Sequence, residues 1–463
     1  MSEPLLNIAE PAAAEAVEKV ARLVKEAGGR AYVVGGAVRD ALTGTQCHDL
    51  DVEVFGLSPE KLAAALEKEF KLNLVGSSFG VMKLSGVDVD VAIPRRENKT
   101  GSGHRGFLME FDPSLTLSEA AARRDFTVNA IMYDLDDRRI VDPHNGQRDL
   151  RDGILRPVSS HFSEDPLRVL RAMQFLARLK FTPAPELVEV CRKMTPENLP
   201  VERIGEEWKK LLLKGLEPSR GLDFLRTCGW IDFYPELKYL IGCQQYPKWH
   251  PEGDVWQHTL LCLDAAAKMR DTADGRDDLI FMLSVLCHDF GKPSTTVFEP
   301  DGRITSKGHE ESGAEPAERF LARLFRDASI APDVLPIVEN HLKPYSYFYN
   351  HAGDRAFRHL AVRVRRCDLL AKVALADSSG RPPLPPDREP VEWFMKKIRD
   401  LELAAGAPKP LIMGRHVLEL GVAPGPAVGR LTAACYQAQL DGKFSTLPDA
   451  LTALRTLIND LKS

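Results

Sequence analysis

The residues best suited to chemistry in the first part of the chain are Asp49 and Asp51, in the segment DLDVEV. Alternate residues of a strand point to the same face, so a strand here would present both carboxylates together. Two carboxylates on one rigid edge can hold Mg²⁺, which keeps water and accepts substrate phosphates as further ligands. The preceding loop at 35–40 (GGAVRD) offers backbone N–H groups and an arginine to the same phosphates. This combination favours a nucleotide-transferring site over an exposed strand with solvated acids.

Three further segments carry weaker signals of the same chemistry. Asp90 lies in a second alternating strand (DVDV) and could hold metal or accept a proton, although a solvated strand face explains it equally well. Arg124 belongs to a double arginine, which suits phosphate but is more often a solvated face. Residues 163–172 (SEDPLRVLRA) begin like a capped helix on which Asp165 and Arg168 share a face. That pair is either an ordinary ion pair or a polar edge that hydrogen-bonds a base.

A second group of candidate residues lies in the middle of the chain, which is unusually rich in histidine. His288 and Asp289 are adjacent in the segment CHDFGK, and Asp377 follows on a later expected helix. Imidazole and carboxylate groups drawn from several helices can build a transition-metal site that activates water. A lone histidine is usually a core residue, but an adjacent His-Asp with spaced partners favours the metal interpretation. The spaced histidines are His250, His258, His309 and His341.

Composition sets the broad class of the protein. A chain of 463 residues with 44% hydrophobic and 27% charged residues predicts two to four mostly helical domains with real cores. The net charge of −5 means that a nucleic-acid partner needs a local basic stripe, for which 203–226 and 355–372 are the best candidates. The eight cysteines form no CxxC pair, which indicates reduced thiols. Without a membrane-length apolar run or a secretion signal at the start, we expect a cytoplasmic protein with no membrane partner.

The apolar pattern predicts a small mixed sheet first and helices afterwards. A helix near 118–132 and a strand pair around 131–142 would complete the first domain, and the polar segment 94–118 is expected to be a mobile loop. From 163 onward the pattern is helical, with a break at the proline cluster 382–386. The earlier strands are expected at 31–34, 49–55, 72–75, 81–84 and 87–93, and the helices at 13–27, 37–43 and 58–70.

Five motifs, in order, carry a resemblance to a known family. The chain resembles the class II tRNA nucleotidyltransferases, the CCA-adding enzymes, which share a head with bacterial poly(A) polymerases. The motifs are GGAVRD (35–40), DLD (49–51), RRDFTVNA (123–130), DPHNGQRDLRDGILR (142–156) and EDPLRVLRA (164–172).

The resemblance implies an α+β fold with a polymerase-β-like head. Four parts are expected: a nucleotidyltransferase head at 1–156, a helical neck and body at 157–245, an HD domain at 246–381, and a helical tail at 382–463 that contacts tRNA. The implied reaction adds CCA to the tRNA 3′ end from CTP and ATP without a nucleic-acid template. No DNA partner is expected.

The resemblance also assigns roles in the head. Mg²⁺ would be held by Asp49 and Asp51, with Asp90 as a third catalytic carboxylate, and the family uses Asp165 and Arg168 to read the edges of CTP and ATP. The full set of implied nucleotide-binding residues is Gly35, Gly36, Arg39, Arg124, Asp125, Asp165, Arg168 and Arg171.

The histidine-rich region resembles the HD phosphohydrolases, a domain that some CCA-adding enzymes carry. The match implies the ligands His258, His288, Asp289 and Asp377, with Asp368 competing for the last place and His309 and His341 extending the site to a second metal. Family members prefer Ni²⁺ or Mn²⁺ and hydrolyse phosphomonoesters or 2′,3′-cyclic phosphodiesters. Lys292 would meet a phosphate.

Rival functions remain open from the sequence. They are a poly(A) polymerase, a CC-only or A-only tRNA nucleotidyltransferase, and an HD phosphohydrolase whose head only binds RNA. The polar segment 94–118 favours full CCA addition, because CC-only relatives lack a mobile loop there. The sequence does not decide the oligomeric state.

Overall fold

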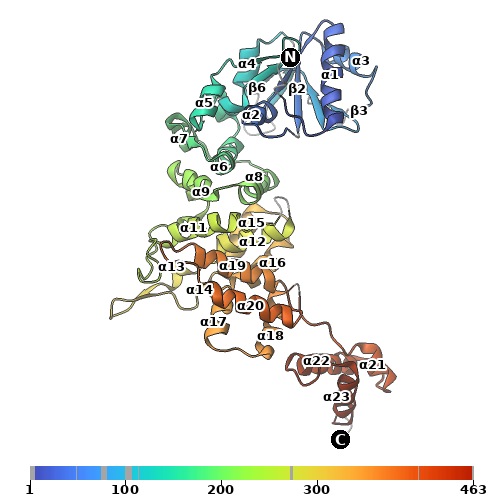
Figure 1. Cartoon of the computed structure of the whole chain (residues 1–463), viewed down its shortest axis with the longest axis vertical. Coiled ribbons are helices and arrows are strands. Elements are labelled where there is room, and N and C mark those ends of the chain that lie inside the picture. The colour runs from blue at the N-terminus through green and yellow to red at the C-terminus, as the bar shows by residue number, and fades with distance from the viewer. Residues whose placement is uncertain are drawn as a thin grey trace. The chain divides into compact units, whose positions relative to one another are not determined.

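The computed structural model describes residues 6–47, 49–73, 81–99, 107–112, 114–271, 275–404 and 406–460 (Figure 1). The chain forms two compact units. The first comprises Met1–Glu207 and Arg220–Phe233, and the second comprises Trp208–Ser219 and Tyr234–Ser463. The division of the chain into four functional domains stays a prediction.

The first unit is built on a seven-stranded mixed sheet with the order β3-β4-β5-β2-β1-β8-β9. β2 and β5 run parallel, whereas the other neighbouring pairs are antiparallel. The predicted mixed sheet is therefore confirmed. The strands are β1 (Arg30–Val34), β2 (Leu50–Phe55), β3 (Leu72–Asn73), β4 (Val81–Leu84), β5 (Val89–Ala92), β8 (Met132–Asp134) and β9 (Arg139–Val141).

Helices cover both faces of this sheet (Figure 1). α1 (Pro11–Glu26) and α3 (Pro59–Leu66) pack on one face, where Leu50, Val52 and Val54 of β2 point into the core. α4 (Leu117–Ala122) covers the opposite face. Since β2 alternates, its buried residues on the α1 side leave Asp51 and Glu53 on the other side. The apolar half of the strand thus fixes the direction of the acidic half.

Two sequence predictions about the head were wrong. The segment 94–118 is not simply a loop, because β6 (Arg95–Lys99) and β7 (Phe107–Phe111) form an antiparallel ribbon. Residues 100–106 and 113 lie outside the described residues. The helix expected at 118–132 ends at Ala122. It breaks because Asp125 accepts hydrogen bonds from Phe126 N and Asn129 Nδ2, which stabilise a 3₁₀ turn, η2 (Thr127–Asn129).

The remaining elements up to Lys238 are short helices and one strand pair. Trp230 donates a hydrogen bond to the Cys191 carbonyl over 3.0 Å and so ties the first unit's helices together. The elements are α2 (Gly36–Leu42), α5 (Gly146–Asp152), β10 (Ile154–Leu155), η3 (Ser160–Glu164), α6 (Leu167–Leu179), β11 (Thr182–Pro183), α7 (Pro185–Arg192), α8 (Val201–Lys214), α9 (Pro218–Thr227), η4 (Trp230–Phe233) and α10 (Pro235–Lys238).

The second unit is helical and centres on α11 (Val255–Ala267), α12 (Arg276–Cys287) and α19 (Cys367–Ser379), which contact one another. All three are apolar around much of their circumference, as expected of helices inside a bundle. Around them lie α13 (Lys292–Thr295), β12 (Val297–Phe298), β13 (Ile304–Thr305), α14 (His309–Ser312), α15 (Ala314–Leu324), α16 (Ile330–Val338), α17 (Lys343–Tyr349), α18 (Asp354–Val364) and α20 (Arg388–Asp400).

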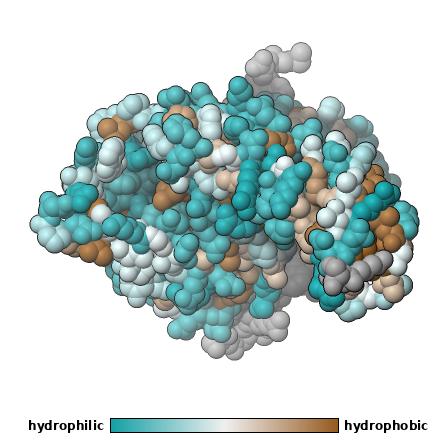
Figure 2. All heavy atoms as spheres, turned by 90° about the horizontal axis from the view of Figure 1, so that it is seen from below, coloured by the Kyte–Doolittle hydropathy of each residue, from teal (hydrophilic) through white to brown (hydrophobic). Residues whose placement is uncertain are grey.

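The C-terminal helices α21 (Gly414–Glu419), α22 (Pro426–Leu440) and α23 (Leu447–Asp460) enclose a small core of their own. Asp441, just after α22, accepts from His359 Nε2 on α18 at 3.0 Å. Figure 2 shows a face dominated by hydrophilic side chains, with apolar ones scattered or in small groups. Among the described residues, no helix has both the length and the apolar character needed to cross a bilayer.

Candidate active sites

The first candidate site is the acidic edge formed by β2 and β5. Asp51 and Asp90 stand opposite each other in the parallel register, and Asp49 precedes β2 by one residue. Lys83 on β4 pairs with Asp90, with 2.8 Å between Nζ and Oδ2. The sheet therefore brings Asp51 and Asp90 together, while Asp49 lies just outside β2 and near enough to add negative charge at Asp51.

Negative charge is concentrated at Asp51. The pKa of Asp51 is raised above its ordinary value, first because nearby protein atoms displace water, and then because Asp90, Asp49 and Glu53 add negative charge. The Arg124 guanidinium opposes this rise. The residue keeps an exposed side, so an ion can reach it. A set of oxygen donors whose charge is only partly balanced fits a hard divalent cation.

Gly35 brings the glycine loop close to these carboxylates. Its φ of 77° lies in the left-handed region that favours glycine. A Cβ at this position would lie 3.3 Å from Arg124 Nη1 and 3.6 Å from Asp51 Oδ2. A cavity of about 230 Å³ opens beside the loop, lined in part by Asp51, Glu53, Asp90 and Arg124. The cavity beside the acidic edge is thus lined by one positively charged and three negatively charged side chains.

A buried polar network joins three of the sequence motifs. Arg39 Nη1 donates to Asn129 Oδ1 over 2.6 Å, and Asn129 Nδ2 donates to Asp125 Oδ1 over 3.0 Å. Arg171 Nε then donates to Asp125 Oδ2 over 2.7 Å, and Arg171 Nη2 forms an ion pair with the same oxygen at 2.6 Å. Arg39 is only 4% exposed, and its guanidinium lies 5.2 Å from the centre of the Phe175 ring. Arg39 and Arg171, predicted to bind nucleotide, here hold the GGAVRD, RRDFTVNA and EDPLRVLRA segments together.

Asp165 and Arg168 do not form the ordinary ion pair that was one interpretation of their spacing. Asp165 Oδ2 instead accepts from Arg203 Nη2 at 3.0 Å, while Oδ1 accepts from the Leu167 N–H. Arg168 donates to the carbonyls of His161 and Arg123, each at 2.7 Å. Arg203 was missed as a partner, since its only signal was the basic character of the 203–226 region.

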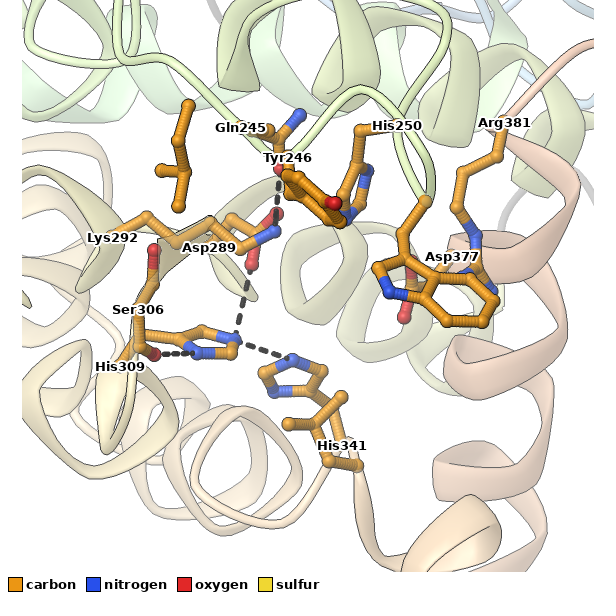
Figure 3. A pocket seen from close by; sticks show the side chains of 13 residues that line it. Gln245, Tyr246, His250, Asp289, Lys292, Ser306, His309, His341, Asp377 and Arg381 are labelled. Atoms are coloured by element: carbon orange, nitrogen blue, oxygen red, sulfur yellow. Dashed lines mark hydrogen bonds and ion pairs between the residues drawn. The ribbon is translucent and has the colours of Figure 1, made fainter. Parts of the chain in front are cut away.

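The second candidate site lies in the helical unit. A cavity of about 280 Å³ opens among its helices. Figure 3 shows Asp289, His309 and His341 on one side of it and Asp377 on another. His258 Nε2 is 3.1 Å from Asp377 Oδ1 and 3.7 Å from Asp289 Oδ2. His288 Nε2 is 3.2 Å from Asp289 Oδ2. The predicted residues on α11, α14 and α19, those that directly follow α12, and His341 therefore converge on one place.

Backbone carbonyls orient three of these imidazoles. A carbonyl that accepts from Nδ1 fixes the tautomer and leaves Nε2 as a lone pair, which is how metal-ligating histidines are usually held. His309 and His341 bring their Nε2 atoms within 3.2 Å of each other. Two lone pairs facing each other this closely repel unless a cation or proton lies between them. The Nδ1 contacts run from His288 to Val285 O at 2.7 Å, His309 to Ser306 O at 2.8 Å, and His341 to Val338 O at 2.7 Å.

Several buried atoms here fit a bound metal. His288 Nε2 and both oxygens of Asp289 have no hydrogen-bond partner among the described residues. Lys292 Nζ lies 2.7 Å from Asp289 Oδ2, a close ionic contact whose geometry is not that of a hydrogen bond. Burial lowers the pKa of His341 to about 3, and the neighbouring His288 and His309 lower it further, so its imidazole is neutral at physiological pH. Neutral imidazoles with carboxylates are ligands of transition metals.

Close backbone packing positions the cluster. A Cβ on Gly291, within the CHDFGK segment, would lie 2.0 Å from the His309 carbonyl oxygen. A Cβ on Gly380, just after α19, would lie 2.3 Å from Cys262 Sγ. Asp368 points elsewhere and pairs with Arg366 through two contacts of 2.9 and 2.7 Å. The structure therefore places Asp377, and not Asp368, beside His258.

Three family models match separate stretches of the chain. The Poly A polymerase head domain matches residues 31–156, and the HD domain matches 255–378. A third, the probable RNA and SrmB-binding site of polymerase A, matches 180–241. The acidic edge thus lies within the first matched stretch and the residues from His258 to Asp377 within the second, whereas Asp165, Arg168 and Arg171 fall between matched stretches.

A multifunctional CCA protein of Verminephrobacter eiseniae is 38% identical over 73% of this chain and 79% of its own length. The chain belongs to the multifunctional CCA protein family. The Xylella fastidiosa (strain 9a5c) member is 36% identical over 76% of this chain and 84% of its own.

Solved structures share the family fold. A CCA-adding enzyme in complex with CTP aligns with a TM-score of 0.64 at 17% identity, over 100% of this chain and 98% of its own. The Thermotoga maritima enzyme complexed with tRNA aligns with a TM-score of 0.61 at 17% identity, over 99% and 98%. The polymerase-type head and the HD domain both imply divalent metal ions. Among the described residues, the side-chain groups close enough to hold an ion lie in or beside the HD region, where His258 meets His288 and Asp377, and Asp289 meets His309 and His341.

Proposed function

We propose that this member of the family adds the 3′-terminal CCA to tRNA from CTP and ATP and also hydrolyses phosphate esters in its HD domain. The observation that carries the first activity is the alignment of Asp51 and Asp90 on adjacent parallel strands beside the glycine loop. Relatives named as multifunctional CCA proteins and a similar enzyme solved with CTP support the substrate class. A similar enzyme complexed with tRNA supports tRNA as the partner. The proposed location is the cytoplasm, where tRNA ends are matured.

In the head, Asp49 and Asp51 would hold Mg²⁺. The ion supplies charge neutralisation at the α-phosphate and at the departing pyrophosphate. Asp90 faces Asp51 and would take the proton of the tRNA 3′-hydroxyl or share the ion, once Lys83 moves from it. The Arg124 guanidinium, near both Gly35 and Glu53, would bind the triphosphate. These groups orient the hydroxyl for in-line attack.

Base selection would fall to Asp165 and Arg168. Oδ2 of Asp165 can exchange its bond with Arg203 for one with a base edge. Arg168 holds two backbone carbonyls, so its guanidinium is fixed in direction. A rigid donor beside a carboxylate acceptor discriminates bases through hydrogen bonds that the wrong base leaves unmade.

In the HD domain, His258, His288, Asp289 and Asp377 would bind a transition metal such as Ni²⁺ or Mn²⁺. The ion supplies an activated water at neutral pH. His309 and His341 lie next to Asp289 and would hold a second ion, as the 3.3 Å from His309 Nε2 to Asp289 Oδ1 suggests. The proposed substrates are phosphomonoesters and 2′,3′-cyclic phosphodiesters of RNA ends.

One assay tests the nucleotide-adding activity. The purified protein is incubated with tRNA lacking its last three nucleotides and with labelled CTP or ATP, singly and together. We expect two added nucleotides with CTP alone and three with both. A long A tract would instead identify a poly(A) polymerase, and no extension would leave the head as an RNA-binding module.

A further inference from the structure

The four clustered histidines are not held in the same way. His288, His309 and His341 each direct Nδ1 to a backbone carbonyl three residues earlier. His258 directs Nδ1 to a side chain, Glu252 Oε1, at 2.8 Å. A carboxylate acceptor in place of a carbonyl raises the basicity of the imidazole and adds a fixed negative charge behind the ligand.

Glu252 contacts a second histidine with the same oxygen. His250 Nδ1 also lies 2.8 Å from Glu252 Oε1, and the rings of His250 and His258 meet edge to face with 4.9 Å between centres. The Glu252 side chain is only 1% exposed, and its Oε2 is buried without a hydrogen-bond partner among the described residues. A buried carboxylate held this way is costly unless the site uses it.

His250 belongs to the cavity wall. It lines the 280 Å³ cavity together with Asp289 and Asp377, and Figure 3 shows it beside Tyr246, across from His341. Nδ1 of His250 is taken by Glu252, so only Nε2 is left to bind another group. Among the described residues, none makes a hydrogen bond to this Nε2. With the proton on Nδ1, Nε2 is an acceptor for a hydroxyl group inside the cavity.

We propose that Glu252 is a positioning residue of the HD site, which orients His258 toward the metal and His250 toward the substrate. His250 then accepts a hydrogen bond from a hydroxyl beside the scissile phosphate, such as a ribose hydroxyl at an RNA end. The inference rests on the proposed phosphohydrolase function. Glu252 lies in the loop before α11, so one side chain outside the bundle controls two imidazoles.

The test uses the full chain and two readouts. Mn²⁺ binding is measured by isothermal titration calorimetry, and kcat and KM are measured with 2′,3′-cyclic AMP and with p-nitrophenyl phosphate. We expect Glu252→Gln to weaken Mn²⁺ binding about 10- to 100-fold, the usual cost of losing an outer partner of a ligand. His250→Ala should keep Mn²⁺ binding near the wild-type value and lower kcat/KM for the ribose substrate more than for the aryl phosphate.

Glu310→Gln is the matched control. Glu310 Oε2 lies 3.5 Å from His309 Nδ1, but that nitrogen already has the Ser306 carbonyl at 2.8 Å. The control should therefore bind Mn²⁺ like the wild type. Equal weakening in both variants, or unchanged Mn²⁺ affinity and kcat in Glu252→Gln, would overturn the proposal.

The design separates this inference from the function on which it rests. A wild-type protein that hydrolyses neither substrate refutes the phosphohydrolase function, while the Mn²⁺ titrations still test the positioning role. Thermal unfolding of each variant shows that it is folded at the assay temperature. Glu252→Gln keeps the size of the side chain and decides the question even if Glu252→Ala does not fold.

Discussion

Asp51 on β2 stands directly opposite Asp90 on the parallel strand β5, and the two belong to segments that are 39 residues apart in the chain. Parallel neighbours keep their side chains on the same face, so the two carboxylates converge without any loop having to hold them. The apolar residues that alternate with these aspartates in β2 and β5 are buried in the core, so the two carboxylates stay on the opposite face of the sheet. The site is therefore as rigid as the sheet core beneath it.

Asp165→Ala should blur the choice between CTP and ATP more than it slows transfer. The carboxylate is proposed to accept from the base edge, and a lost hydrogen bond to a base is worth about 1–3 kcal/mol of discrimination. The measurement is the ratio of kcat/KM for the correct and incorrect nucleotide at each added position. Arg203→Gln is the control, since it removes the partner of Asp165 but leaves the carboxylate. Unchanged selectivity in Asp165→Ala would refute the template role.

His288→Ala or Asp289→Ala should abolish phosphate ester hydrolysis and spare tRNA extension. Both residues are 1% exposed and converge with His258, whereas the acidic edge proposed to extend tRNA lies in the other compact unit. Each variant is assayed for both activities in parallel. A variant that loses both activities while remaining folded would show that the two sites are not independent.

Asp125→Asn should destabilise the head near neutral pH by about 1–3 kcal/mol, because it breaks a charged hydrogen-bonded pair with Arg171. Although burial opposes it, Arg171 and then Asn129 hold the pKa of Asp125 below its ordinary value. A carboxyl group whose pKa is lower in the folded than in the unfolded protein stabilises the fold at pH values above its unfolded pKa of about 3.9. This stabilisation disappears as the pH falls through the folded pKa.

The difference between wild type and Asp125→Asn should accordingly shrink below about pH 4. Hydrogen exchange of peptides covering β8 and α6, at several pH values, measures this difference in stability within the head. A difference that stays constant from pH 7 to pH 3 would contradict the assigned pKa shift.

Gly291→Ala should destabilise the HD domain by about 1–3 kcal/mol, the usual cost of overpacking. The added methyl would lie 2.0 Å from the His309 carbonyl oxygen, so the segment carrying His309 must shift. Thermal unfolding measures the loss of stability, and Mn²⁺ affinity measures the effect of the shifted His309 segment. Gly353→Ala is the control, because a Cβ there meets nothing within 4 Å and φ is negative. Similar losses in the two variants would argue against this packing role.

Local periodicity made much of the fold predictable. The alternation in DLDVEV predicts that the acids lie opposite the apolar residues, and the buried apolar half of β2 confirms this direction for Asp51 and Glu53. That Asp49 shares their face stays a prediction, because it precedes the strand. Likewise the adjacent His288 and Asp289 indicate a cluster whose partners are spaced along helices. Such signals are readable because they depend on neighbours within one strand or helix.

The failures came from partners distant in the chain. Nothing near Arg171 indicates that it pairs with Asp125, 46 residues away, and that buried pair accompanies the end of the helix expected through 132. Glu252 was missed because a carboxylate in an irregular loop has no periodic signature. Arg39 was assigned to the nucleotide by type without its contacts with Asn129 and Phe175 being foreseen, and its nucleotide-binding role stays a prediction. The partners of Arg171, Glu252 and Arg39 are all set by tertiary contacts, which local sequence patterns do not reveal.

The most direct test of the nucleotidyltransferase site is CTP incorporation into tRNA lacking CCA, in a single turnover with saturating Mg²⁺, by wild type, Asp51→Ala and Asp137→Ala. Asp137 also follows a strand of the sheet but pairs with Arg30. Asp51→Ala should slow incorporation by at least about 100-fold, since metal ions supply several kcal/mol to phosphoryl transfer, and Asp137→Ala should match wild type. Incorporation by a folded Asp51→Ala at the wild-type rate would contradict the account.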